Sequence, residues 1–263
     1  MIDTTHLVPR LRTIESLAVI PRVASTNLIA RRIVSECIEN ELSLPQAMII
    51  AGEQFAGRGR NERFWSSPPG KGIYATTLLT RPVGELALVP LAIANIVASY
   101  LRDTYAIDAR IKWPNDVLAD RKKIAGILIE ARIQEDRAFL MIGIGINVEP
   151  VKDHTRPNAT SIREATTRPF TGVDDATRAF VEHLDEQLSH PLDHDTVLGA
   201  WRALAIHRPG DRIHCVLGDR TVDGTWSRID EEGRAVVNTS EGVIAVSAGD
   251  LLMVNPERSE GSS

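Results

Sequence analysis

Strand-forming and helix-forming segments follow one another in an irregular order, and this order constrains the fold more than any other feature of the sequence. Apolar residues recur at helical spacing after Ser25, Thr26 and Asn27, which are potential N-cap residues, and again at 180–188 and 201–204. Runs rich in Ile, Leu, Val and Thr, which indicate β-strands, occupy residues 47–51, 73–80, 124–133 and 138–148. Because these segments do not form βαβ repeats, we expect an α+β fold in which a mixed β-sheet has its helices on one side.

The sequence pattern changes after residues 207–210. Short strand-like runs separated by glycines follow at residues 212–217, 221–229, 235–239 and 243–247. About 50 residues of this kind predict a small β-barrel. The length of 263 residues agrees with one large and one small domain. We therefore expect a main domain at residues 1–206, the barrel at 207–256 and a disordered polar tail at 257–263.

Charge is distributed unevenly along the chain. The sequence has 30 Lys and Arg against 35 Asp and Glu, a net charge of −5, which argues against nucleic acid or an anionic membrane as a partner. Residues 57–71 and 110–123 nevertheless carry +3 each, so the rest of the chain carries −11. We expect the two basic windows to be the places where an anionic ligand binds.

Several features favour a cytoplasmic protein. The N-terminus lacks the apolar core of a signal peptide. The most apolar stretch, residues 86–100, contains Pro90 and Asn95 and is shorter than the ~20 residues of a membrane span, so it predicts a buried helix. Cys37 and Cys215 are too few for a disulfide framework or a structural zinc site.

Common catalytic and nucleotide-binding motifs are missing from the sequence. It contains no G-x-G-x-x-G, Walker A, H-E-x-x-H, C-x-x-C or G-x-S-x-G pattern. A dinucleotide fold and a protein-bound metal are therefore not predicted, and a nucleotide would have to be bound by another kind of site.

The first basic window contains a Gly-Arg-Gly-Arg run at residues 57–60, followed by Arg63 and Trp65. Alternating glycines let the backbone approach a ligand closely, and guanidinium groups offer forked donors to carboxylate or phosphate. The run is suited to binding an anion. Taken alone, the run favours a solvated basic surface turn over a ligand-binding loop.

The second basic window contains Lys112-Trp-Pro-Asn-Asp116, and Lys123 to Glu130 follow it. Pro, Asn and Asp in succession favour a tight turn between strands, which would direct Lys112 and Asp116 toward one place. A plain hairpin turn without a function is the alternative interpretation of this cluster.

These blocks, in this order, resemble the biotin protein ligase family. The resemblance rests on residues 24–27; Gln54 with 57–60, Arg63 and Trp65; residues 67–74; 112–116; 123–130; and Gly143, Gly145 and Asn147. It spans roughly residues 10 to 255, because the C-terminal part fits the SH3-like domain of the family. The resemblance implies the biotin/lipoate ligase catalytic fold, which is similar to that of class II aminoacyl-tRNA synthetases.

The resemblance implies an enzyme that joins biotin and ATP into biotinyl-5′-AMP and then transfers biotin to a lysine of a carrier protein. The implied carrier is the biotin carboxyl carrier domain of an acyl-CoA carboxylase or pyruvate carboxylase. Mg²⁺ is implied as charge on the triphosphate rather than as a metal held by a protein cage. The implied enzyme is a monomer or a weak homodimer.

By matching position, the resemblance also assigns roles to individual residues. The ureido end of biotin is expected at Ser25, Thr26, Asn27 and Gln54; the carboxylate and the adenylate phosphate at Arg58, Gly59 and Arg60; and further adenylate contacts at Arg63, Trp65, Asn115, Gly126 and Asn147. Lys123 is expected to bridge the biotin carboxylate and the α-phosphate, with support from Lys112. Asp116 is expected to position or deprotonate the incoming lysine amine.

Two departures from the family pattern and two alternatives remain. Glu62 stands where the family usually has glycine, and only 24 residues precede Ser25, too few for a winged helix-turn-helix, so we do not expect an operator-binding repressor. A lipoate ligase or octanoyl transferase would share the fold, but its Arg-x-x-Gly-Gly-Gly loop is absent. A nucleic-acid-binding module is the second alternative.

Overall fold

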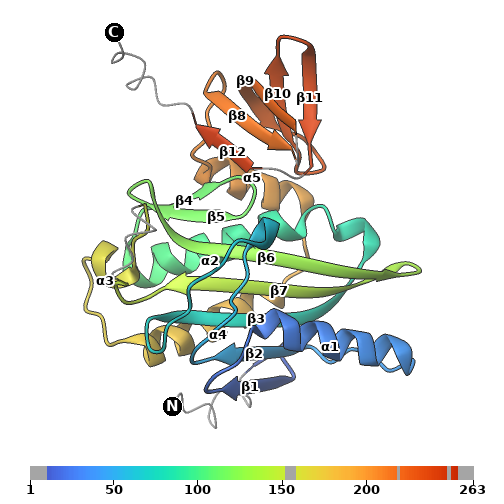
Figure 1. Cartoon of the computed structure of the whole chain (residues 1–263), viewed down its shortest axis with the longest axis vertical. Helices are drawn as coiled ribbons and strands as arrows, with labels where there is room; N and C mark the ends of the chain where they lie inside the picture. Colours follow the sequence, from blue (N-terminus) through green and yellow to red (C-terminus); the bar gives the residue numbers. More distant parts are fainter. Residues whose placement is uncertain (1–10, 152–157, 218–219, 248–249, 254–263) are drawn as a thin grey trace.

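A seven-stranded mixed β-sheet is the centre of this computed structural model, which describes residues 11–151, 158–217, 220–247 and 250–253 (Figure 1). Its strands are β1 (Ser16–Ile20), β2 (Ala47–Ala51), β3 (Gly72–Pro82), β4 (Ala109–Lys112), β5 (Asp116–Ala119), β6 (Lys122–Gln134) and β7 (Arg137–Asn147). Their order is β1-β2-β3-β7-β6-β5-β4. Only β1 and β2 are parallel among these neighbours, and every other pair is antiparallel.

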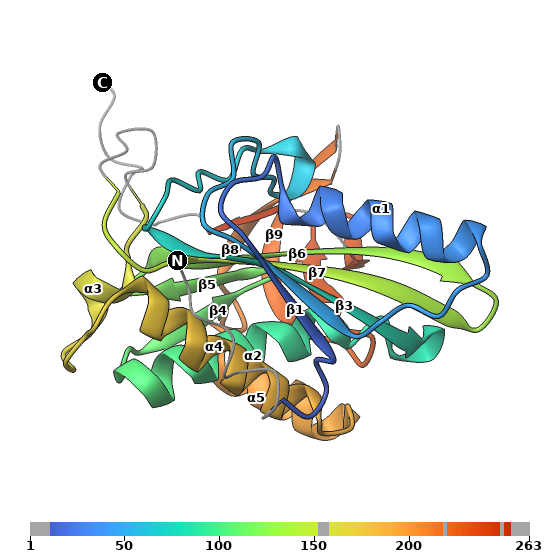
Figure 2. The same ribbon diagram turned by 90° about the horizontal axis from the view of Figure 1, so that it is seen from below.

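Helices cover both faces of this sheet (Figure 2). The helices are α1 (Thr26–Glu39), α2 (Val89–Tyr105), α3 (Ile162–Ala165), α4 (Val173–Leu188) and α5 (His194–Leu204), with two 3₁₀ turns, η2 (Arg60–Glu62) and η3 (Val83–Glu85). Ile50 belongs to the core beneath α2 and α4, whereas its neighbour Ile49 packs with α1. Since successive side chains of a strand point to opposite faces, α1 lies on the face opposite α2, α4 and α5.

The predicted α+β fold with a mixed sheet is confirmed, but the one-sided packing of helices was wrong for α1. The helical pattern after Ser25 predicts the helix and does not say which face it covers. Both faces of β2 are buried, as expected for a strand with helices on each side.

Helix α2 forms within and beyond the apolar stretch 86–100. It starts at Val89, with Pro90 in its first turn, where the missing N–H of proline costs no helical hydrogen bond. It ends before Ala106, whose φ of 55° is left-handed. Most of its side chains are buried, which agrees with the predicted buried helix. In the described part of the chain, no helix is both long and apolar enough to cross a membrane.

The C-terminal part forms a separate five-stranded antiparallel sheet, in the order β11-β10-β9-β8-β12. Its strands are β8 (Arg212–Leu217), β9 (Arg220–Ile229), β10 (Ala235–Thr239), β11 (Gly242–Val246) and β12 (Asp250–Met253). The first four match the predicted runs, and β12 was not predicted. The expected domain boundary at residues 206 and 207 falls between α5 and β8 and stays a prediction. The predicted tail at 257–263 lies outside the described residues.

Candidate active site

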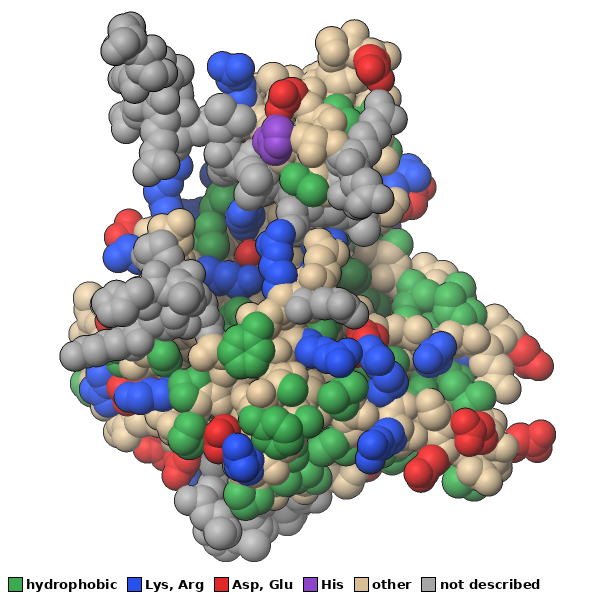
Figure 3. All heavy atoms as spheres, in the orientation of Figure 1, with side chains coloured by type: hydrophobic (Ala, Val, Ile, Leu, Met, Phe, Trp, Pro, Cys, Tyr) green, Lys and Arg blue, Asp and Glu red, His purple; other side chains and the backbone are tan. Residues whose placement is uncertain are grey.

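One large cavity opens between the head of α1, the loop 57–65, strands β5 to β7 and the segment that joins α5 to β8. Lys and Arg side chains gather in this hollow, between the small sheet and the body of the molecule (Figure 3). All fifteen site residues predicted from the sequence line it: Ser25, Thr26, Asn27, Gln54, Arg58, Gly59, Arg60, Arg63, Trp65, Lys112, Asn115, Asp116, Lys123, Gly126 and Asn147. Their individual roles stay predictions.

Glycines make the floor of the cavity flat. Gly126 and Gly145 lie opposite each other on β6 and β7, and the indole ring of Trp65 lies on both. A Cβ atom at Gly145 would come within 2.5 Å of the Trp65 ring, and one at Gly143 within 2.3 Å of Asn27 Oδ1. Side chains at these positions would therefore fill the space that Trp65 and Asn27 occupy.

A buried network of neutral polar groups forms at the head of α1. Gln54 Oε1 accepts hydrogen bonds from the backbone N–H of Thr26 (2.8 Å) and from its hydroxyl (3.1 Å). Gln54 Nε2 donates to Ser67 Oγ at 2.9 Å. Ser25 is the N-cap residue, and its hydroxyl makes no capping hydrogen bond. The side chains of Ser25, Thr26, Gln54 and Ser67 are therefore buried beside the cavity, and all four are uncharged.

Asn27 is held by groups on two strands, β3 and β6. Its Oδ1 atom lies 2.6 Å from the hydroxyl of Thr76, and its Nδ2 atom donates to Glu130 Oε2 at 3.0 Å. Glu130 also accepts from Arg31 on α1. Hydrogen-bond partners on both sides of the amide fix its orientation.

The loop 57–65 is closed by its own backbone hydrogen bonds. Gly59 N donates to Arg63 O at 2.7 Å, and Trp65 N donates to Gly57 O at 3.0 Å. Between them lies η2, in which Asn61 has a left-handed φ of 52°. The backbone of Glu62 belongs to η2, but its side chain lies outside what the structure describes, so the predicted effect of this residue stays a prediction.

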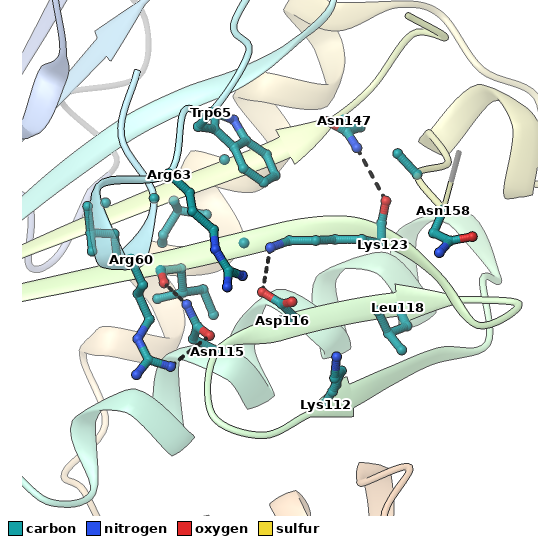
Figure 4. Close-up of a pocket in the computed structure, with 18 of the residues that line it drawn as sticks. Arg60, Arg63, Trp65, Lys112, Asn115, Asp116, Leu118, Lys123, Asn147 and Asn158 are labelled. Carbon is teal, nitrogen blue, oxygen red and sulfur yellow. Dashed lines mark hydrogen bonds and ion pairs between the residues drawn. The ribbon is translucent and has the colours of Figure 1, made fainter. Parts of the chain in front are cut away.

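The Lys123 ammonium group lies between an acidic and an aromatic side chain (Figure 4). Its Nζ atom lies 2.6 Å from Asp116 Oδ1 and 5.2 Å from the centre of the Trp65 ring. Arg63 points into the same space. The Lys123 backbone is tied to the segment after residue 157, because its N–H donates to Asn158 O at 2.7 Å and its carbonyl accepts from Thr160 N at 3.0 Å.

Asn115 and Asn147 donate hydrogen bonds to backbone carbonyl groups beside the cavity. Asn115 Nδ2 donates to Ile127 O at 2.6 Å, and its Oδ1 atom accepts from Arg60 at 3.4 Å (Figure 4). Asn147 Nδ2 donates to Thr160 O at 3.0 Å and to Lys123 O at 3.3 Å. Asn115 therefore contacts Arg60, and Asn147 holds the backbone of Lys123.

The cavity is strongly basic in a chain that is acidic overall. Among the residues that the structure describes, its lining contains nine Lys and Arg side chains and two carboxylates, Asp116 and Asp211. No group of three or more His, Cys, Asp or Glu side chains that could hold a metal ion occurs among the described residues. The lining favours a ligand with several negative charges.

Several cavity residues were missed by the sequence reasoning. The missed basic and polar residues are Arg110, Arg121, Asn158, Arg208 and Arg212. Arg110 and Arg121 lay within the basic window 110–123, which was a usable signal. Arg208 and Arg212 were assigned to the C-terminal barrel, and only the fold brings them to the cavity. Thr76 was a polar residue in an apolar run, a weak sign of the contact with Asn27.

Comparison with known proteins places this architecture in a family. The model of the biotin/lipoate A/B protein ligase family matches residues 19–147. A biotin–[acetyl-CoA-carboxylase] ligase of Mycobacterium tuberculosis is 30% identical over 247 residues, which cover 90% of this chain and 88% of that protein. The chain belongs to the biotin protein ligase family. A second such ligase, of Paracoccus denitrificans, is 31% identical and is covered to 90% of its length.

Other family members extend the comparison. The bifunctional ligase/repressor BirA of Bacillus subtilis is 29% identical, and the alignment covers 65% of that protein. Among solved structures, the biotin protein ligase from Aquifex aeolicus in complex with biotin and ATP superposes with a TM-score of 0.72 at 26% identity, covering 92% of this chain and 99% of that one. The family resemblance seen in the sequence is therefore confirmed.

Proposed function

We propose that this biotin ligase family member activates biotin with ATP to biotinyl-5′-AMP and transfers the biotin to a lysine of a biotin carboxyl carrier domain. The observation that carries the proposal is one cavity that combines a neutral polar end, at Thr26 and Gln54, with nine basic side chains. A neutral ureido group and a row of phosphates need these two environments side by side. Relatives named as biotin ligases support the choice of substrate.

The polar end of the cavity suits the ureido ring of biotin. Ser25, Thr26 and Gln54 are almost fully buried, and each offers donors or acceptors that carry no charge. A ureido group is neutral and needs both a donor and acceptors when it leaves water. Asn27, whose amide is held by Thr76 and Glu130, shapes this end by fixing its neighbours.

In the first step, a carboxylate oxygen of biotin forms a bond to the α-phosphorus of ATP. The bond from that phosphorus to the bridging oxygen of the β-phosphate breaks, and pyrophosphate leaves with the electron pair. Two anions must approach each other, so the site has to neutralise their charge as the bond forms. Lys123, which lies between Trp65 and Asp116, would bridge the two anions, and Arg58, Arg60 and Lys112 would add further positive charge.

In the second step, the amine of the carrier lysine attacks the carbonyl carbon of the mixed anhydride. The bond between that carbon and the phosphate oxygen breaks, and AMP leaves. Asp116 pairs with Lys123, so the attraction of Lys123 to the adenylate phosphate would release the Asp116 carboxylate to accept the proton of the amine.

The nucleotide and the carrier complete the proposal. Mg²⁺ would enter with the triphosphate and supply charge neutralisation, since the described residues contain no carboxylate cluster to hold it. The carrier domain would belong to an acyl-CoA carboxylase or pyruvate carboxylase, with the enzyme acting as a monomer or weak homodimer. We place the reaction in the cytoplasm, which agrees with two free, buried cysteines.

The test is transfer of biotin by the purified protein. With biotin, ATP and Mg²⁺, a biotin carboxyl carrier domain should become labelled on its acceptor lysine, as read by mass spectrometry. A carrier domain whose acceptor lysine is replaced by arginine is the matched control and should stay unlabelled. Transfer of lipoate or octanoate in place of biotin would reject the proposal in favour of the related activities on this fold.

A further inference from the structure

A buried histidine lies between the C-terminal sheet and the turn formed by residues 112–116. His207 lies in the segment between α5 and β8 and is only 3% exposed. Its ring stacks on Trp226 of β9, with ring centres 4.5 Å apart and planes inclined by 20°. Trp226 stacks in turn with Trp201 of α5. The ring is thus held in place by both parts of the molecule.

The Nε2 atom of His207 makes its hydrogen bond to the turn 112–116. It accepts from the backbone N–H of Trp113 at 3.1 Å. Lys112 precedes Trp113, and Asp116, the partner of Lys123, lies three residues after it. One buried acceptor therefore fixes the backbone between two of the predicted catalytic side chains.

His207 is a suitable acceptor because it is neutral. Burial lowers its pKa to about 4, and the nearby positive charge of Lys112 adds to this effect. An imidazole that accepts at Nε2 carries its proton on Nδ1. Among the described residues, His207 Nδ1 has no hydrogen-bond partner. Within the described part of the chain, the ring therefore makes one hydrogen bond, and this bond is to the turn.

Two further contacts connect the same turn to its surroundings. The indole N–H of Trp113 donates to Gly233 O of the C-terminal sheet at 3.1 Å. Ile206 N donates to Ile111 O at 2.9 Å. The turn is therefore held by the C-terminal sheet, and the strand before it is held by the residue that precedes His207.

We propose that His207 is a positioning residue, through which the C-terminal sheet holds Lys112 and Asp116 in their active arrangement. The inference rests on the proposed ligase function for its kinetic consequence. His207 lies behind the turn and need not touch either substrate. Its loss should lower the rate of the chemical steps more than it weakens the binding of biotin, whose expected pocket lies at the head of α1.

A matched pair of amide variants tests this role. In His207→Gln, the Oε1 atom can take the place of Nε2, whereas in His207→Asn the acceptor is one bond too short. We expect His207→Asn to lower kcat for pyrophosphate release by at least about tenfold, because an unsatisfied buried N–H costs roughly 1.4 kcal/mol or more. His207→Gln should retain most of kcat, and the KM for biotin should change less than about twofold in both. Equal loss in the two variants would overturn the proposal.

Amide hydrogen exchange provides a readout that does not depend on activity. Exchange at residues 112–116 should be about tenfold faster in His207→Asn than in His207→Gln. His214→Asn, which changes an exposed histidine of β8, is the control and should leave this segment unchanged. Equal exchange in the Gln and Asn variants would show that the hydrogen bond from Trp113 N to His207 does not hold the turn. Absence of adenylation by the wild-type protein would instead reject the proposed function. The exchange data would still show whether His207 holds the turn 112–116.

Discussion

The ion pair of Lys123 and Asp116 leads to a specific prediction about Lys123. Lys123→Ala should lower adenylate formation by about 100- to 1,000-fold, because the cation expected between two reacting anions is removed. The fold should survive, since the Lys123 side chain is 35% exposed and such pairs contribute about 1 kcal/mol or less. Pyrophosphate release measures the loss, and circular dichroism checks the fold. Lys122→Ala, at the exposed neighbouring residue, should remain active; unchanged release by Lys123→Ala would reject the role of this lysine.

Gly145 gives a second prediction for a single residue. A Cβ atom there would come within 2.5 Å of the Trp65 ring, so Gly145→Ala should displace the indole from its place beside Lys123. We expect the affinity for ATP in the presence of biotin to fall by at least about tenfold, because the ring would lose its contacts with Lys123 and with the nucleotide. Tryptophan fluorescence and calorimetry measure the two effects. Gly199→Ala in α5, where a Cβ meets nothing within 4 Å, should leave ATP binding intact.

Sequence patterns predicted the residues of this site better than the contacts among them. Ser25, Gln54 and Lys123 lie far apart in the chain, and the family motifs identified all of them as lining one site. The pairing of Asp116 with Lys123, and of Asn27 with Glu130, could not be predicted, because it depends on strand register. A shift of one residue in that register would place these side chains on the other face.

Among the elements, the loop 57–65 is closed by hydrogen bonds of its own and rests on the sheet through the ring of Trp65. Its closing hydrogen bonds, Gly59 to Arg63 and Trp65 to Gly57, lie within the loop, and Arg60 reaches Asn115 across the cavity at 3.4 Å. The loop is therefore suited to cover a bound intermediate. It was predicted as an anion-binding segment, but the short turn η2 within it was not, because left-handed Asn61 leaves no clear sequence signal.

The Arg60 side chain is expected to retain the adenylate beneath this loop. Arg60→Gly should release biotinyl-5′-AMP before transfer, because a guanidinium contact to phosphate is lost, and the free adenylate should label lysines of added bystander proteins. Labelling of bovine serum albumin, read by streptavidin blot, should rise by about tenfold over wild type. Arg137→Gly, on the exposed end of the β6–β7 hairpin, is the control. No rise in bystander labelling would count against this role of Arg60.

Residues from the main domain and from the start of the C-terminal sheet line the same cavity. The C-terminal strands were predicted from glycine-separated runs, but the contribution of Arg208 and Arg212 to the cavity was not. Local patterns report which segments form strands, and they carry no information on how a small sheet packs against a distant turn. His207, which joins these parts, is for the same reason a residue that only the fold identifies.

His207 also makes the stability of the molecule depend on pH. Its pKa is about 4 in the folded chain, below the ordinary value near 6.5, so between these values the unfolded chain binds more protons than the folded one. The stabilising contribution is therefore complete above about pH 6.5 and is lost as the pH falls toward 4, by up to roughly 3 kcal/mol. His194 has a raised pKa and contributes with the opposite sign, so the wild-type protein alone cannot isolate the effect.

A comparison of variants isolates the contribution of His207. Urea unfolding of the wild-type protein and of His207→Gln should be measured at about pH 7, about pH 6 and about pH 5. Since Gln does not titrate, the difference in unfolding free energy between the two proteins should shift in favour of His207→Gln as the pH falls, while every other titrating group cancels. A difference that stays constant from pH 7 to pH 5 would mean that the folded chain accommodates a charged His207, and the neutral acceptor of the Trp113 N–H would lose its basis.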